Sequence, residues 1–243
     1  MPDGYREDLA YVHDAGFLSF AENAAPMLVE ALRSGGLERG LVIDLCCGSG
    51  PLSRRLSDTG YDVLGVDISG AMVEMARKRV PGGRFVEGSI LSLELQPCVA
   101  VAAVGECLNY LFDEGNTEEG LEDLLRRIHE ALIPGGVLLF DAAGPGRAPG
   151  PGPSRIHAEG EDWAVLATAE EDGERGVLTR RITTFRKVGE LYRRGEEVHH
   201  LRLIRREAIA TQLRNLGFNV RILDSYGEMR FPPGLTGFLA RKP

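Results

Sequence analysis

Short apolar runs alternate with helical stripes of apolar residues through the first 143 residues of the chain. Runs at 41–45, 61–67, 84–88, 99–105 and 137–143 are bounded by Gly or polar residues, as buried parallel strands are. Between them, apolar residues recur at helical spacing. This alternation predicts an α/β fold, in which right-handed crossovers build a doubly wound, mostly parallel sheet with helices on both faces.

Ordinary start and stop residues mark the ends of these helices. Pro51 is favoured at a first helical position, and Ser69 is suited to cap a helix that runs to about Arg79. A strongly amphipathic helix over 121–132 ends at the Pro-Gly-Gly sequence 134–136. The sequence therefore predicts a three-layer core.

Two segments lie outside the alternation. Residues 5–34 have the spacing of two helices, and 144–154 contain eight Gly or Pro in eleven positions, which neither a helix nor a strand tolerates. Several β-strands punctuated by glycines follow within 161–204. The units we expect are a helical lid (1–36), a core (37–143 and 205–243), and a linker with a small antiparallel β insertion over the substrate site (144–204).

Composition indicates an ordinary globular protein. The chain has 43% hydrophobic and 26% charged residues, and no apolar run approaches the roughly 18 residues that cross a bilayer. The first twenty residues lack the apolar stretch of a signal peptide, so we expect a cytoplasmic protein without a membrane partner. The four cysteines have no metal-ligand spacing. They predict buried, reduced thiols and no metal site.

Charge is unevenly distributed along the chain. The net charge is −8, which argues against a protein that coats nucleic acid. The segment 175–206 nevertheless holds ten Lys or Arg and three Glu. It carries +7, so the rest of the chain carries about −15. Such a segment could face an anionic substrate or be a solvated strand surface.

The loop after the first strand, CCGSG at 46–50, is typical of ligand binding. Glycines let a ligand approach the backbone, and the following helix start offers free N–H groups. Ser53 stands where a dinucleotide fingerprint has its third glycine, and no Gly-Lys-Ser/Thr follows. Asp44 would oppose a pyrophosphate but suits a cationic ligand.

Three further loops follow strands and carry polar groups. Asp67 ends the second strand, where a carboxylate can accept both hydroxyls of a ribose or act as a helix-dipole acid. The loop at 88–90 can border an adenine. After the fourth strand, Glu106 or Tyr110 could stabilise a positively charged group, unless this loop only caps a helix.

At this point the chain resembles the class I methyltransferases that depend on S-adenosylmethionine (SAM). The segments that carry the resemblance are VIDLCCGSG (42–50), GVDIS (65–69), EGSI (87–90), GECLNYL (105–111) and ALIPGGVLLFD (131–141). The resemblance spans about 38–143 and 205–241. It implies a seven-stranded sheet whose last strand, near Leu235–Arg241, runs antiparallel.

The resemblance also implies a set of cofactor contacts. The residues that it places around SAM are Asp44, Gly48, Gly50, Asp67, Ile68, Ser89, Ile90 and Gly105. To these we add Tyr11, Cys46, Met72 and Glu106 as expected cofactor contacts. Two positions depart from the family pattern: Cys46 stands where Gly or Ala is usual, and Ser89 where an Asp often reaches the adenine amine.

Residues of the insertion and the lid are candidates for the acceptor side. On the strand at 191–203, one face carries Arg193, Glu197 and His199 between leucines. We expect His199 or Glu197 to orient the acceptor or take its proton, with Tyr110 as a third catalytic candidate; an ordinary ion pair on a solvent-facing strand is the alternative. Tyr11 is expected to lie closest to the cofactor among the lid residues, which are Tyr5, Tyr11, His13, Phe17 and Phe20.

The sequence thus predicts in-line transfer of a methyl group from SAM to a nitrogen or oxygen atom of a small molecule, by a monomer or homodimer. An RNA or protein methyltransferase that uses 175–206 is one alternative, although the chain lacks the Asn-Pro-Pro-Tyr sequence used on base nitrogens. An NAD-dependent oxidoreductase is a second, opposed by Ser53 and Asp44. A SAM-binding module without catalysis is a third.

Overall fold

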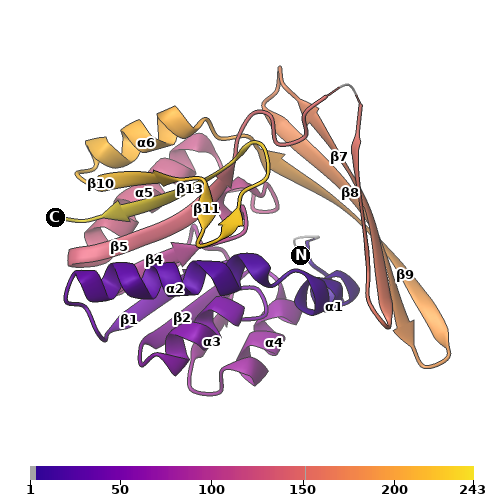
Figure 1. Ribbon diagram of the computed structural model, residues 1–243, viewed down its shortest axis with the longest axis horizontal. Helices are drawn as coiled ribbons and strands as arrows, with labels where there is room; N and C mark the ends of the chain where they lie inside the picture. Colours follow the sequence, from indigo (N-terminus) through magenta and orange to yellow (C-terminus); the bar gives the residue numbers. More distant parts are fainter. Residues whose placement is uncertain (1–3, 151) are drawn as a thin grey trace.

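A computed structural model describes residues 4–150 and 152–243. A seven-stranded sheet in the order β10-β13-β5-β4-β1-β2-β3 forms its centre, and helices cover both faces (Figure 1). β13 runs antiparallel to its neighbours β5 and β10, and the other pairings are parallel. The predicted fold class and the antiparallel last strand are confirmed. The strands of this sheet are β1 (Leu41–Leu45), β2 (Asp62–Asp67), β3 (Arg84–Glu87), β4 (Cys98–Ala103), β5 (Leu132–Ala143), β10 (Asn219–Leu223) and β13 (Leu235–Arg241).

Different helices cover the two faces of the main sheet. On β1, Ile43 packs with the apolar faces of α5 and α6, whereas Val42 packs with those of α2 and α3. This is the period-two alternation of a strand buried on both faces. The helices are α1 (Glu7–Gly16), α2 (Ser19–Ser34), α3 (Pro51–Asp58), α4 (Gly70–Arg79), α5 (Glu118–Ala131) and α6 (Arg206–Asn215), with a 3₁₀ turn, η1, at Cys107–Asn109. Among the described residues, no helix is long and apolar enough to cross a bilayer.

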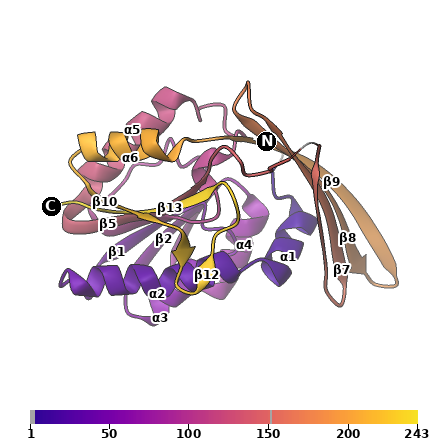
Figure 2. The same cartoon turned by 45° about the horizontal axis from the view of Figure 1, so that its top comes forward.

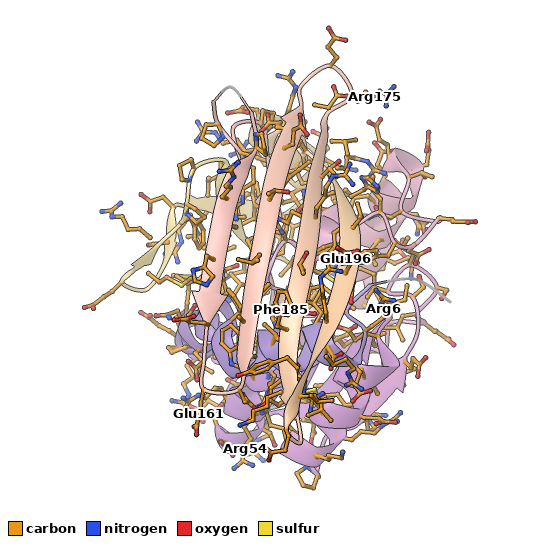
Figure 3. All side chains as sticks on the ribbon, turned by 90° about the vertical axis from the view of Figure 1, so that its right-hand side faces the viewer. Arg6, Arg54, Glu161, Arg175, Phe185 and Glu196 are labelled. Carbon is orange, nitrogen blue, oxygen red and sulfur yellow. A yellow bond between two sulfur atoms is a disulfide. The ribbon has the colours of Figure 1, made fainter. Side chains whose placement is uncertain are left out.

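A separate four-stranded antiparallel sheet, β6-β7-β8-β9, stands beside the core (Figures 1 and 2). Its strands are β6 (Ser154–Glu159), β7 (Trp163–Asp172), β8 (Val177–Val188) and β9 (Leu191–Arg202), and a small hairpin joins β11 (Ser225–Tyr226) to β12 (Met229–Arg230). Figure 3 faces the outer side of the four-stranded sheet. Helix α1 lies between the four-stranded sheet and the core, and its Val12 packs on Trp163 and Val165 of β7.

Two strands, β6 and β5, differ from the sequence prediction. β6 was not predicted, because this edge strand is largely exposed and its apolar alternation is limited to Ile156 and Ala158. β5 begins at Leu132, before the Pro-Gly-Gly sequence that was expected to separate helix from strand. Leu132 pairs with Cys98 of β4, and a register shift follows there, so the strand absorbs the Pro-Gly-Gly as an irregularity.

Asn109 joins the insertion sheet to the core. Its side-chain amide donates to the carbonyl oxygens of Ala143 (2.8 Å) and Arg202 (2.6 Å), and its Oδ1 accepts from the Ala143 N–H (3.0 Å). The side chain is fully buried, so these bonds satisfy groups that water cannot reach. They fix the loop after β4 against the ends of β5 and β9.

Candidate functional site

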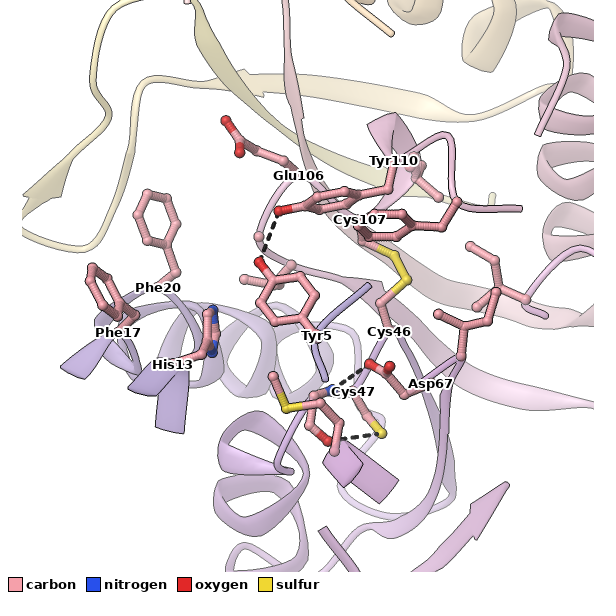
Figure 4. A pocket seen from close by; sticks show the side chains of 18 of the residues that line it. Tyr5, His13, Phe17, Phe20, Cys46, Cys47, Asp67, Glu106, Cys107 and Tyr110 are labelled. Carbon is pink, nitrogen blue, oxygen red and sulfur yellow. Dashed lines mark hydrogen bonds between the residues drawn. A yellow bond between two sulfur atoms is a disulfide. The ribbon is translucent and has the colours of Figure 1, made fainter. Parts of the chain in front are cut away.

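A cavity of about 430 Å³ opens at the carboxyl ends of β1, β2 and β4, where open α/β sheets bind ligands. The loops after these strands form its floor, and α1, the start of α2 and the inner face of the insertion sheet cover it (Figures 2 and 4). Of the expected cofactor residues, the cavity is lined by Cys46, Gly48, Asp67, Ile68, Met72, Ser89, Ile90, Gly105 and Glu106.

The glycine loop is held to the next strand by Asp67. Gly48 has φ 53° and donates its N–H to Asp67 Oδ2 (2.9 Å), and the Ser69 N–H donates to Oδ1 (2.9 Å). Burial raises the pKa of Asp67, although these bonds favour its ionised form. This enclosed carboxylate at the cavity wall has the chemistry to accept hydroxyl hydrogens of a ribose, and Ile68 and Ile90 supply apolar surface for a base.

Asp44 and Gly50 lie outside the cavity lining, contrary to the expectation that both would surround the cofactor. The carboxylate of Asp44 accepts from Ser53 Oγ (2.6 Å), and burial raises its pKa to about 7. Gly50 (φ 82°) opens α3 against Ala76, whose Cβ would lie 3.1 Å from a Cβ at this position. Both residues therefore support the loop from behind.

An acid does stand beside Ser89, supplied by another loop. The Ser89 hydroxyl donates to Asp113, which lies after β4 and also lines the cavity. Ser89 Oγ accepts from the Leu91 N–H at 3.0 Å. Sequence reasoning missed Asp113, because its place 24 residues further along the chain gives no sign that the two loops meet.

Cys46 and Cys107 form a disulfide, so the prediction of reduced thiols is wrong for this pair. Their Cα atoms lie 5.9 Å apart. The 61-residue separation concealed the pairing, but β1 and β4 are neighbours in the sheet, and the loops that follow them meet. Both cysteines line the cavity, and Cys47 and Cys98 are free and buried.

Glu106, in the loop after β4, is held through both its backbone and its side chain. Its backbone is left-handed (φ 61°), and the N–H groups of Gly105 and Glu106 donate to Asp141 at 2.9 and 2.6 Å. Its carboxylate pairs with Arg147 Nε and with an Arg180 Nη, both at 2.6 Å. Burial alone would raise the pKa of Glu106, but Arg180 and Arg147 outweigh it and leave the pKa lowered.

Tyr5 crosses the cavity opening and meets Tyr110, as Figure 4 shows; the two hydroxyls lie 2.9 Å apart. Burial raises the pKa of both phenols, so both stay protonated. The backbone of Tyr5 is fixed as well: its carbonyl accepts from Ser69 Oγ (2.7 Å), and its N–H donates to Glu197 Oε2 (2.8 Å).

Tyr11 lies away from the cavity, so the expectation that it is the lid residue nearest the cofactor does not fit the structure. Its hydroxyl donates to Asp162 (2.5 Å), and the guanidinium carbon of Arg186 sits 3.9 Å from its ring centroid. Helix α1 turns this side towards the insertion sheet. The lid residues that do line the cavity are Tyr5, His13, Phe17 and Phe20.

Glu197 and His199 also lie outside the cavity lining, so the geometry argues against the direct catalytic role expected for them. His199 is fully buried, with its Nε2 2.8 Å from Glu197 Oε2. Glu197 accepts the N–H groups of Tyr5 and Arg6 at 2.8 and 2.9 Å. The pair therefore anchors the N-terminal segment over the cavity.

His13 contributes a neutral imidazole to the cavity wall. Burial lowers its pKa to about 4, and its enclosed Nδ1 has no hydrogen-bond partner among the described residues. The ring lies against Tyr5, edge to face, with centroids 5.3 Å apart. An uncharged ring with a free acceptor nitrogen can receive a hydrogen bond from a ligand.

Comparison with known proteins agrees with this site. A family model described as a methyltransferase domain matches residues 42–136. The Bacillus subtilis (strain 168) protein YqeM, which is named as a methyltransferase, is 26% identical over 195 residues, which cover 75% of each chain.

Two solved structures share the fold over nearly the whole chain. A SAM-dependent methyltransferase from Clostridium acetobutylicum ATCC 824 superposes with a TM-score of 0.80 at 18% identity, covering 96% of this chain and 97% of that one. The SAM-bound amino pentose methyltransferase CalS10 from Micromonospora echinaspora gives 0.76 at 19% identity, with the same coverage. The matched domain holds the glycine loop and the acid after β2: this chain contains a methyltransferase domain, within the fold of the SAM-dependent methyltransferases.

Proposed function

We propose that this enzyme transfers the methyl group of SAM to a nitrogen or oxygen atom of a small molecule, by in-line displacement. The observation that carries the proposal is that one cavity has two differently built ends. Gly48, Asp67 and Ile90 form a cofactor end, and Glu106 and Tyr110 belong to an acceptor end beneath the insertion sheet. SAM, when bound, supplies an electrophilic methyl group on a sulfonium.

The residues of the acceptor end mainly position the acceptor and exclude water. Holding a nucleophile in line with the methyl carbon supplies roughly 7–11 kcal/mol of the barrier. The Tyr110 hydroxyl and the unpaired Nδ1 of His13 can each form a hydrogen bond that orients the acceptor. Tyr5 closes the opening above them.

A small acceptor is favoured over RNA or protein because much of the basic segment 175–206 is already paired within the chain. Arg180 faces Glu106, whereas Arg186 and Arg193 pair with Glu7 and Asp8 of α1. These three arginines therefore hold the lid and are not free to meet the phosphates of a nucleic acid. The amino pentose substrate class of CalS10 supports a nitrogen acceptor here.

The test is a methyl-transfer assay with labelled SAM and separate panels of small amines, hydroxy compounds, RNA and protein. We expect turnover with members of the small-molecule panel. In Tyr110→Phe we expect kcat to fall about tenfold or more, with the Kd for SAM little changed. Tyr192→Phe, at an exposed tyrosine of β9, is the matched control and should behave as wild type. Methylation of RNA or protein with none of any small molecule would refute the proposal.

A further inference from the structure

Two arginines meet one carboxylate at the acceptor end. Arg147 comes from the Gly/Pro linker and Arg180 from the inner face of β8, and each contacts a different oxygen of Glu106. The linker is itself fixed, because Glu171 accepts the N–H groups of Gly146 (3.0 Å) and Ala148 (3.3 Å) on either side of Arg147. Both guanidinium groups are therefore held at defined positions on the cavity wall.

This cluster carries a surplus positive charge. Among the described residues, neither arginine has an ion pair with any acid except Glu106. The side chains of Arg147 and Arg180 are only 20% and 14% exposed. Asp141 behind the loop accepts from backbone N–H groups and from the Tyr226 hydroxyl. One carboxylate facing two guanidiniums leaves one cation without a counter-charge, and that is costly where water is scarce.

The remaining acids of the cavity belong to its other end. Asp67 binds the glycine loop, and Asp113 binds Ser89. Figure 4 shows Asp67 and Glu106 on opposite sides of Tyr5. The cavity is thus electrically divided, with acids where the adenosine is expected and excess positive charge where the acceptor is expected.

We propose that Arg147 and Arg180 bind an anionic oxygen group, a carboxylate or a phosphate, carried by the methyl acceptor. Guanidinium groups donate paired hydrogen bonds that match these planar or tetrahedral anions. Glu106 takes one N–H from each arginine and keeps both directed into the cavity. Apolar residues of the insertion sheet, Val165 and Ile182, contact the uncharged part of the acceptor.

This inference rests on the proposed function, so the test separates the two. Succinate and inorganic pyrophosphate are titrated by calorimetry at low salt into wild type and Arg147→Gln, each with and without S-adenosylhomocysteine. We expect wild type to bind one of the anions, and Arg147→Gln to bind it about 10- to 100-fold more weakly, as the loss of a charge-assisted hydrogen bond implies. S-adenosylhomocysteine should bind both proteins equally well.

Two further variants guard against trivial outcomes. Arg181→Gln changes the neighbouring, exposed arginine of β8 and should keep wild-type anion affinity. Arg180→Gln combined with Glu106→Gln removes one cation together with its counter-charge, so the cluster keeps its net charge of +1 on Arg147. It should also weaken anion binding, because the hydrogen bonds of Arg180 are lost.

Preference for succinate would identify a carboxylate acceptor, and preference for pyrophosphate a phosphorylated one. The inference is overturned if wild type binds neither anion, or if Arg147→Gln binds as tightly as wild type. If wild type does not bind S-adenosylhomocysteine, the proposed function is refuted instead. The anion titrations without S-adenosylhomocysteine then still decide whether the arginines bind anions.

Discussion

At the residue scale, the loops of this site depend on side chains that hold backbone. Asp67 accepts the backbone N–H of Gly48, and Asp141 accepts those of Gly105 and Glu106. Asp44 accepts instead from the side-chain hydroxyl of Ser53. Each acid is buried and satisfied by donors of the chain. A ligand in the cavity therefore meets loops that are already shaped, which lowers the entropic cost of binding.

Asp44 gives the unligated protein a pH-dependent stability. Its pKa rises on folding from 3.8 to about 7. The folded state therefore binds the Asp44 proton more tightly than the unfolded state does. The resulting stabilisation of the fold is fully present below pH 4 and is lost as the pH rises through 7. In Asp44→Asn the amide oxygen still accepts from Ser53, but no ionisation cost remains. We expect the stability of Asp44→Asn relative to wild type to improve between pH 5 and pH 8, measured by urea unfolding; an unchanged difference would contradict this.

The disulfide between Cys46 and Cys107 should stabilise the fold. Closing a loop of this length, with a 61-residue separation, lowers the entropy of the unfolded chain by an amount worth about 4 kcal/mol. We expect a reductant to lower the free energy of unfolding of wild type by a large part of that amount. The double variant Cys46→Ser, Cys107→Ser should match reduced wild type and ignore the reductant. Identical melting of oxidised and reduced wild type would exclude the bond in solution.

At the scale of elements, the lid is held by β9 rather than by its own helices. Glu197 accepts two consecutive N–H groups from the segment before α1, and Arg193 of the same strand pairs with Asp8 (2.5 Å). The outer edge of β9, with Arg6 beside Glu196, is visible in Figure 3. Movement of the insertion sheet and opening of the lid are thus mechanically linked.

Replacing Glu197 by Ala should loosen this lid. Two partly buried hydrogen bonds to backbone are lost, so we expect faster proteolytic cleavage near residues 4–16 and a KM for SAM raised about tenfold. Glu196→Ala, at the adjacent exposed residue, is the control and should leave both quantities unchanged. Wild-type protease resistance in Glu197→Ala would show that the lid is anchored elsewhere.

The sequence predicted the elements whose signal is local. Buried strands such as β1 and β4 are continuous apolar runs, and the glycine loop needs its left-handed residues, so both could be identified along the chain. The direction of the Tyr11 side chain could not be predicted, because α1 packs on both the core and the insertion sheet. The sheet residues that contact Tyr11 are more than 140 residues further along the chain. The same holds for Asp113 beside Ser89.

At the scale of the whole molecule, the acidic body and the basic segment are complementary. The chain carries −8 overall, yet the arginines of β8 and β9 meet acids of α1 and of the loop after β4. This pairing brings the insertion sheet over the carboxyl ends of the main sheet (Figure 2). The fold thereby encloses one cavity from three segments that are far apart in sequence.

The most direct measurement is calorimetric titration of wild type and Asp67→Ala with S-adenosylhomocysteine and, separately, with NAD. Wild type should bind S-adenosylhomocysteine and not NAD, and Asp67→Ala should bind it about 10- to 100-fold more weakly, because a charged hydrogen bond is worth roughly 1.5–3 kcal/mol. Asp62→Ala, an exposed acid at the start of the same strand, should bind as wild type does. Binding of NAD by wild type, or undiminished affinity in Asp67→Ala, would contradict the assignment of this cavity.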